Sequence, residues 1–417
     1  MDTRQNRLFR RDFTLVVIGQ IISLFGNAIL RFALPLYLLR QTGSARLFGA
    51  AGAAAFIPAV LCSPAGGVVA DRVNKRNIMV VLDFSTAGLI LVFALLLGRA
   101  PLVPLMVVCL MLLYGIAGAY QPAVQASIPL LAGTEQLTGA NAVINMVGTL
   151  SGLLGPVIGG VLFGAFGIRP ILQVSIGCFL LSAVMELFIR IPHCPRAAAG
   201  GVLATVRRDL AESWRFIRRE RPVFLSVLAV LALFNLVLSA ALIVGIPVAV
   251  VQALGMSDSR LGLTQGAMGL GGLFGGILTA CLGSRLRLRQ GGILLLAASL
   301  TAAGMGSALL PGIPPSIGWG VITAMSFALM VLSTMLVVLL SAAVQGQTPP
   351  ELLGKVMAFI MAISNCASPL GQAVYGTLFE AHPAWAVLLG AAAAAAVTAA
   401  YSGGVFRALD AGGTQAA

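Results

Sequence analysis

The sequence predicts an all-α integral membrane protein in which twelve transmembrane helices form two pseudo-symmetric six-helix bundles. Of its 417 residues, 59% are apolar and only 9% are charged, whereas a soluble protein carries about 25% charged residues. Apolar runs of about 20 residues, long enough to cross the hydrocarbon core as a helix, recur along the whole chain. Together these observations exclude an ordinary soluble enzyme.

One polar segment divides the apolar spans into two halves of six. Gln125 and Gln345 each stand four residues before a proline, ahead of the fifth span of their half, as in transporters built from repeated units. We expect an N-terminal bundle at 1–190, a cytoplasmic linker at 191–222, a C-terminal bundle at 223–406 and a cytoplasmic tail at 407–417. The spans are expected at 13–38, 46–70, 77–98, 102–126, 140–166, 169–190, 223–251, 261–283, 291–311, 316–341, 356–380 and 384–406.

The net charge of +13 indicates topology rather than a nucleic-acid partner. With the N-terminus in the cytoplasm, the predicted spans put twenty Lys and Arg residues on the cytoplasmic side and five on the other. This is the asymmetry of the positive-inside rule. We therefore expect a multi-pass protein of the cell (inner or plasma) membrane with both termini in the cytoplasm and no nucleic-acid ligand.

The loop between spans two and three carries the sharpest local motif, Gly67-Val-Val-Ala-Asp71-Arg72-Val-Asn-Lys75-Arg76. On the residues alone, it reads as a tight turn whose basic side chains keep the loop in the cytoplasm. Its position between these two spans adds a second interpretation.

With four further segments, this motif resembles the signature of the major facilitator superfamily, and within it the macrolide-efflux branch. The resemblance covers nearly the whole chain and implies the major facilitator fold. The other segments are 19–24, 42–45, 129–138 and 350–356.

The resemblance also implies a latch that holds the cytoplasmic side closed. In this interpretation Asp71 pairs with the start of the helix near 354–357, and Arg72 and Arg76 support it. Free backbone amides and the helix dipole favour a carboxylate at such a position. Asp83, close in sequence, is expected to join the charge network of this loop.

Span five contains Gly155, Pro156, Gly159 and Gly160, similar to a Gly-Pro-Gly-Gly motif that the resemblance associates with exporters. Small residues let helices approach closely, and neighbouring helices can satisfy the backbone groups that a proline frees. Plain helix packing and an exporter-specific gate both remain open here.

Ionisable side chains inside the membrane are costly and therefore functional candidates. Besides Asp83, two lie within the spans. Arg31 either lines a cavity or extends its head to the outer interface. Glu186 stands four residues before Arg190, the spacing of a helical ion pair on a surface.

Four polar side chains are the first candidates for substrate contact, because the resemblance implies that spans one, four, seven and ten line a central cavity. The alternative for each is a hydrogen bond between helices. The candidates are Asn27, Arg31, Gln121 and Asn235.

The linker reads as an amphipathic helix, with Val206, Leu210, Trp214 and Ile217 on one face and arginines around them. Such a helix is expected against the anionic inner leaflet, and a partner-binding helix is the alternative.

The sequence shows no set of residues that would form a catalytic site. The two histidines, His193 and His382, fall in loops on opposite sides, and the sequence contains neither a Walker phosphate-binding motif nor a nucleophile elbow. We expect no enzymatic activity, no metal and no cofactor, and no ATP-driven transport by this chain alone.

The resemblance implies a secondary active transporter that exports hydrophobic or amphipathic, macrolide- or drug-like molecules by alternating access, in exchange for protons. Its expected partners are the small-molecule substrate, protons and the lipid bilayer, and we expect a monomer. Proton exchange usually requires a carboxylate whose burial moves its pKa towards neutrality, and Asp83 is the first candidate carrier.

Two alternatives stay open at this point. A lipid or lysophospholipid flippase could use the same fold, and an apolar groove capped by Arg31 would favour it. A non-transporting membrane receptor or assembly factor would need a larger surface outside the membrane.

Overall fold

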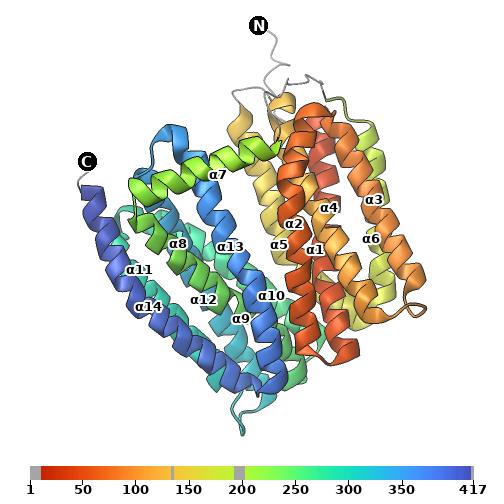
Figure 1. The fold of residues 1–417 in the computed structure, drawn as a ribbon. Helices are drawn as coiled ribbons and strands as arrows, with labels where there is room; N and C mark the ends of the chain where they lie inside the picture. The colour runs from red at the N-terminus through yellow and green to blue at the C-terminus, as the bar shows by residue number, and fades with distance from the viewer. Residues whose placement is uncertain (1–10, 133–135, 192–201, 415–417) are drawn as a thin grey trace. The chain divides into compact units, whose positions relative to one another are not determined.

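The structure is a computed structural model that describes residues 11–132, 136–191 and 202–414. Within these ranges the chain is helical and forms no strand (Figure 1). Twelve helical segments of the described chain are long and apolar enough to cross a membrane. The predicted fold class is therefore confirmed, and each predicted span coincides with one of these segments.

The chain divides by its contacts into two units, of which the first comprises residues 1–43 and 54–199. In this unit α1 packs against α5 and α6, and α3 packs against α4 and α6. Its helices are α1 (Arg11–Thr42), α2 (Ala45–Arg72, from Ala54 on), α3 (Lys75–Leu96), α4 (Leu102–Leu131), α5 (Leu137–Phe166) and α6 (Ile168–Leu187).

The second unit comprises residues 44–53, the start of α2, together with 200–417. Here α10 packs on α12, and α11 packs on α12 and α14. Its further helices are α7 (Val202–Arg219), α8 (Val223–Phe234), α9 (Ala240–Pro247), α10 (Asp258–Leu282), α11 (Gly291–Ser307), α12 (Pro315–Gly346), α13 (Pro350–Ala381) and α14 (Ala384–Thr414), with the 3-10 turns η4 (Gly283–Arg285) and η5 (Leu288–Gln290).

The seventh span, Val223–Ala253, is interrupted twice by π-helical stretches. These are η2 (Asn235–Ser239) and η3 (Val248–Ala253), which follow α8 and α9. Such wide turns are rare and occur often at functional sites, which gives Asn235 a distinctive backbone setting.

Helix α13 begins at Pro350, six residues earlier than the predicted span. A proline is favourable in the first turn of a helix, because its missing amide hydrogen has no partner there anyway. The same turn contains Glu351, so a segment that hydropathy treats as loop extends the helix. Hydropathy locates the apolar core of a helix and underestimates its polar ends.

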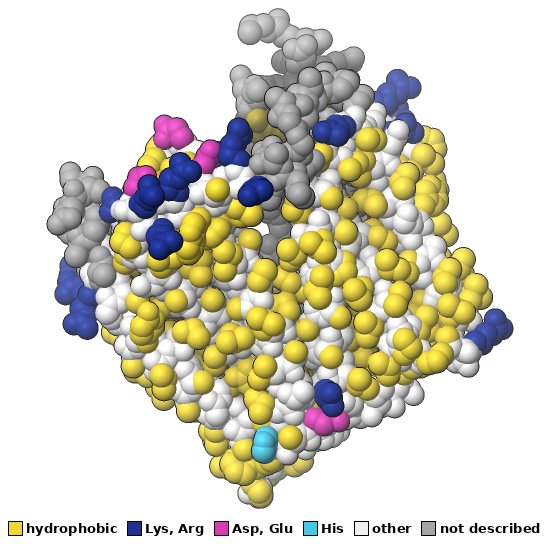
Figure 2. All heavy atoms as spheres, in the orientation of Figure 1, with side chains coloured by type: hydrophobic (Ala, Val, Ile, Leu, Met, Phe, Trp, Pro, Cys, Tyr) yellow, Lys and Arg dark blue, Asp and Glu magenta, His cyan; other side chains and the backbone are white. Residues whose placement is uncertain are grey.

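Helix α7 packs on the other helices of the second unit through one face. Phe216 and Ile217 are buried, and the Phe216 ring lies 6.2 Å from that of Phe224. Lys355 Nζ of α13 lies 2.9 Å from Asp209 Oδ1 and 2.7 Å from Glu212 Oε2. In Figure 2 charged side chains gather over α7, above helices covered by hydrophobic side chains.

Two further apolar residues of α7 lie on its outward side. Leu210 and Trp214 are exposed, although the Trp214 ring reaches Phe359 at 6.2 Å. The side chain of Val206 lies outside the described residues. The predicted apolar face thus divides between a protein-facing part at Ile217 and an outward part at Leu210 and Trp214, and its contact with the inner leaflet stays a prediction.

Candidate functional site

A chain of buried hydrogen bonds crosses the first unit from α1 to α6. Gln20 Nε2 donates to the Tyr120 hydroxyl at 2.7 Å, and the Tyr120 hydroxyl donates to Glu186 Oε1 at 2.7 Å. The helices that carry these residues are separated by long stretches of sequence, and their packing brings the three side chains together. Glu186 and Gln20 are both 0% exposed.

Asp83 of α3 joins this cluster. Its side chain is 3% exposed, lies within hydrogen-bonding range of Ser182 and is close enough to Glu186 to interact with it electrostatically. Ser182 Oγ also donates to the Gly19 carbonyl oxygen at 3.2 Å. Two carboxyl groups therefore share one buried environment.

The cluster retains unused hydrogen-bonding capacity. Gln20 Oε1, Asp83 Oδ2 and Glu186 Oε2 are buried and accept no hydrogen bond from the described part of the chain. Two ionised carboxylates in such a place would repel each other and lose their hydration, so the pair favours retaining a proton. This arrangement can bind and release protons in response to its surroundings.

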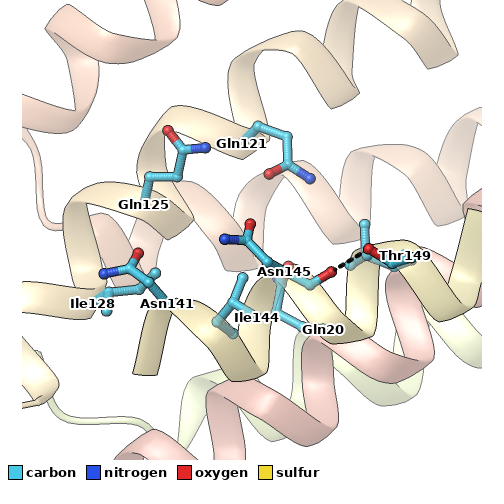
Figure 3. A pocket seen from close by; sticks show the side chains of 10 residues that line it. Gln20, Gln121, Gln125, Ile128, Asn141, Ile144, Asn145 and Thr149 are labelled. Carbon is cyan, nitrogen blue, oxygen red and sulfur yellow. Dashed lines mark hydrogen bonds between the residues drawn. The ribbon is translucent and has the colours of Figure 1, made fainter. Parts of the chain in front are cut away.

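A pocket of about 540 Å³ adjoins this cluster within the first unit. Figure 3 shows the carboxamides of Gln121 and Gln125 projecting from α4, and those of Asn141 and Asn145 from α5. Gln20 also lines this pocket. The remaining lining residues are Leu24, Ile128, Ile144, Gly148 and Thr149.

The structure corrects the expectation for Glu186. The predicted surface ion pair with Arg190 requires both residues on one helix, but α6 ends at Leu187, so Arg190 lies beyond it. The Arg190 backbone amide donates to Asp12 Oδ1 at 3.1 Å. The prediction was wrong because it extended the helix to residue 190, three residues beyond its end at Leu187.

Three of the four predicted substrate-contact residues lie in the first unit, and substrate contact by any of the four stays a prediction. Gln121 lines the pocket. The Arg31 guanidinium lies over the Tyr114 ring, 4.2 Å from its centroid, and Asn27 is half-buried on the same helix. Asn235 belongs to the second unit and donates from Nδ2 to the Leu231 carbonyl oxygen of its own helix at 3.0 Å.

The sequence did not predict that Gln20 and Tyr120 are hydrogen-bonded to each other or that Gln125 lines a pocket. All three are polar residues in apolar helices, and that was the available signal. Sequence periodicity does not show which helices are neighbours, so it could not show that Gln20 and Tyr120 meet Glu186.

The structure corrects the expectation that the motif at 67–76 forms a loop, because its first six residues end α2 at Arg72, only Val73 and Asn74 lie between the helices, and Lys75 begins α3. Asn74 Oδ1 accepts from the Arg76 backbone amide at 3.0 Å and caps the helix, while the Arg76 guanidinium donates to the Leu187 carbonyl oxygen. Lys75 is buried and Arg72 is exposed. Gly67 has room for a side chain, since an added Cβ would lie 4.0 Å from its nearest neighbour, a Cβ of Pro122.

The predicted latch stays a prediction. The side chain of Asp71 lies outside the described residues, and its expected partner at 354–357 belongs to the second unit. The expectation that Asp83 joins the charge network of the motif also stays a prediction. The structure places Asp83 next to Glu186.

Two glycines of span five, Gly155 and Gly159, lie against α1. A Cβ added at Gly155 would lie 2.4 Å from the Cβ of Ala28, and one added at Gly159 would lie 3.0 Å from Phe32 Cδ1. Pro156 lies within α5 without ending it. These contacts match the packing interpretation of the motif, which also includes Gly160.

Across the described ranges, no group of three or more His, Cys, Asp or Glu side chains is placed to hold a metal ion. The side chains that form the cluster and the pocket carry carboxyl, phenol and carboxamide groups.

Comparison with known proteins agrees with this architecture. Residues 16–372 match the family model described as Major Facilitator Superfamily. Macrolide efflux protein A of Streptococcus pyogenes is 26% identical over 367 residues, 87% of this chain and 88% of that relative. The multidrug efflux pump Tap of Mycolicibacterium fortuitum is 24% identical over 386 residues, 89% of this chain and 90% of that pump.

Solved structures share the fold. The nucleoside transporter NupG aligns with a TM-score of 0.75 at 12% identity, over 96% of this chain and 99% of that one. A bacterial homolog of the human lysosomal transporter Spinster aligns with a TM-score of 0.71 at 14% identity, over 97% of both chains. The chain is a multi-pass membrane protein that belongs to the major facilitator superfamily, with relatives named for macrolide and multidrug efflux.

Proposed function

We propose that this protein exports hydrophobic or amphipathic, macrolide- or drug-like molecules across the cell membrane by alternating access, in exchange for protons. It acts as a monomer with both termini in the cytoplasm. Relatives named for macrolide and multidrug efflux that align over most of the chain support the substrate class.

The buried Asp83 and Glu186 pair carries the proposal of proton exchange. A transporter driven by protons needs a group that gains and loses a proton within the membrane, and buried carboxyl groups next to each other do so as a coupled unit. The sequence favours Asp83 as the carrier, and the position of Glu186 beside it supports Glu186 as its partner. Cytoplasmic ends rich in Lys and Arg support the orientation.

The lipid or lysophospholipid flippase receives less support. That function predicts an apolar groove capped by Arg31, whereas the pocket of the first unit is lined by five carboxamides and Arg31 lies over Tyr114. A ligand with several hydrogen-bonding groups fits this lining better than an acyl chain.

Transport in inside-out vesicles tests the proposal. Asp83→Asn should abolish macrolide uptake driven by an imposed pH gradient, and a protonophore should abolish uptake by the unmodified protein. Accumulation in an efflux-deficient host, measured for macrolides, dyes and lipophilic cations, checks the substrate class. Unchanged uptake by Asp83→Asn at every gradient would refute the carrier assignment, and equal accumulation of all compounds with and without the protein would refute drug export.

A further inference from the structure

We propose that Gln20 couples the carboxamide-lined pocket to the buried carboxyl pair, so that a ligand hydrogen-bond donor on Gln20 Oε1 releases a proton from Asp83 and Glu186. This inference rests on the proposed proton exchange. It adds the residue that transmits the signal and the chemical class of ligand, a small molecule that presents hydroxyl or amine hydrogens.

Gln20 belongs to both parts of the site. Its side chain lines the pocket, is fully buried, and donates from Nε2 to Tyr120. Its Oε1 accepts no hydrogen bond from the described residues. Because Gln20 borders the pocket while its Oε1 is buried, a ligand donor that reaches Oε1 by displacing the side chains over it would bind the same carboxamide whose donor reaches the carboxyl pair.

The direction of coupling follows from hydrogen-bond polarisation. A donor on Gln20 Oε1 draws electron density from the amide nitrogen and strengthens its donation to Tyr120, because hydrogen bonds in a chain polarise one another. The Tyr120 hydroxyl then donates more strongly to Glu186, and a hydrogen bond to a carboxylate stabilises its ionised form. The proton leaves the carboxyl pair for solvent.

Exchange of drug for protons requires that ligand binding promote proton release. If ligand binding favours proton release, then proton binding must weaken ligand binding by the same factor, because linkage is reciprocal. The ligand in the pocket and the proton on the carboxyl pair would therefore be bound alternately. A ligand that accepts from Gln20 Nε2 would compete with Tyr120 and have the opposite effect.

The charged and titratable groups around Glu186 are few. Asp83 faces it from α3 and Tyr120 from α4, and Arg76 reaches the carbonyl oxygen of Leu187, the next residue along. Helix α1 contributes the uncharged Gln20, and α5 contains no charged residue. The path through Tyr120 is thus the hydrogen-bonded connection that the structure gives from the pocket to Glu186.

Binding of erythromycin, a macrolide with several hydroxyl groups, to the purified full-length protein tests the inference. Calorimetry across a pH series gives the slope of log affinity against pH, which equals the number of protons released. The slope should approach one for the unmodified protein and fall towards zero for Tyr120→Phe and for Gln20→Met, whose side chain is similar in size. Both variants break the same path, at different links.

Asn141→Ala is the matched control. Asn141 lines the pocket but donates to the Leu137 carbonyl oxygen of its own helix at 2.9 Å, so this change should lower affinity and keep the slope. A purely structural role for Gln20 would lower affinity without changing the slope.

Glu186→Gln separates the two claims. If Glu186→Gln removes the slope while folded Gln20→Met and Tyr120→Phe both retain it, the coupling role of Gln20 is wrong and the proton site stands. If Glu186→Gln binds erythromycin with the slope of the unmodified protein, then the proton site itself is wrong.

Discussion

Replacing Gly155 with alanine tests the close approach of α5 to α1. The added Cβ would lie 2.4 Å from the Cβ of Ala28, whereas nonbonded carbon atoms sit about 3.5–4.0 Å apart. Neither Cβ can rotate away, so the two helices would have to separate locally by at least about 1.1 Å. Overpacking of this kind costs about 1–3 kcal/mol.

Thermal unfolding of the purified protein measures this cost. A change of 1 kcal/mol shifts the melting temperature of a unit of this size by about 2–4 °C, so Gly155→Ala should lower it by about 2–12 °C. Gly152→Ala is the control on the same helix, because an added Cβ there has no neighbour within 4 Å. Equal melting temperatures for both variants would refute the packing argument. A loss of transport by Gly155→Ala with unchanged stability would favour the exporter gate instead.

Two other contacts give further predictions. Lys355→Ala should release α7, because Lys355 is the α13 partner of acidic residues such as Glu212. Chymotrypsin, which cuts after aromatic and leucine residues, should then cut α7 several-fold faster, whereas Arg208→Ala, which loses a looser pair at 3.9 Å, should leave the cutting rate nearly unchanged. Equal rates for both variants would contradict this docking. Arg31→Gln should lose the contact with the Tyr114 ring, worth about 0.5–1 kcal/mol at an exposed site, and a double-mutant cycle of melting temperatures with Tyr114→Leu should show that coupling; strictly additive effects would refute it.

The fold could be predicted from the sequence because the bilayer imposes the length and polarity of every span. The ends of the helices were harder to predict, because the first turn of α13 is polar and a hydropathy scale does not identify it as helix. Glu186 shows the consequence at the site. Its spacing from Arg190 suggested a surface pair, and only the end of α6 at Leu187 separates the two residues.

The meeting of Gln20, Tyr120 and Glu186 could not be predicted from the sequence at all. Each lies on a different helix, and which helices touch depends on close packing at small residues such as Gly155. Sequence patterns identify polar residues in the membrane, whereas tertiary packing decides which of them become partners.

Proton movement driven by a drug gradient tests the central claim most directly. Proteoliposomes that contain the purified protein and a pH-sensitive dye in the lumen are given an erythromycin gradient without any imposed pH gradient. Protons should move opposite to the drug, so the luminal pH should rise as erythromycin enters. This rise should be lost in Asp83→Asn and in Glu186→Gln and retained in Gly152→Ala, where an added Cβ has no neighbour within 4 Å. Drug flow without a pH change in the unmodified protein, or the same pH change in both carboxyl variants, would contradict proton exchange through this pair.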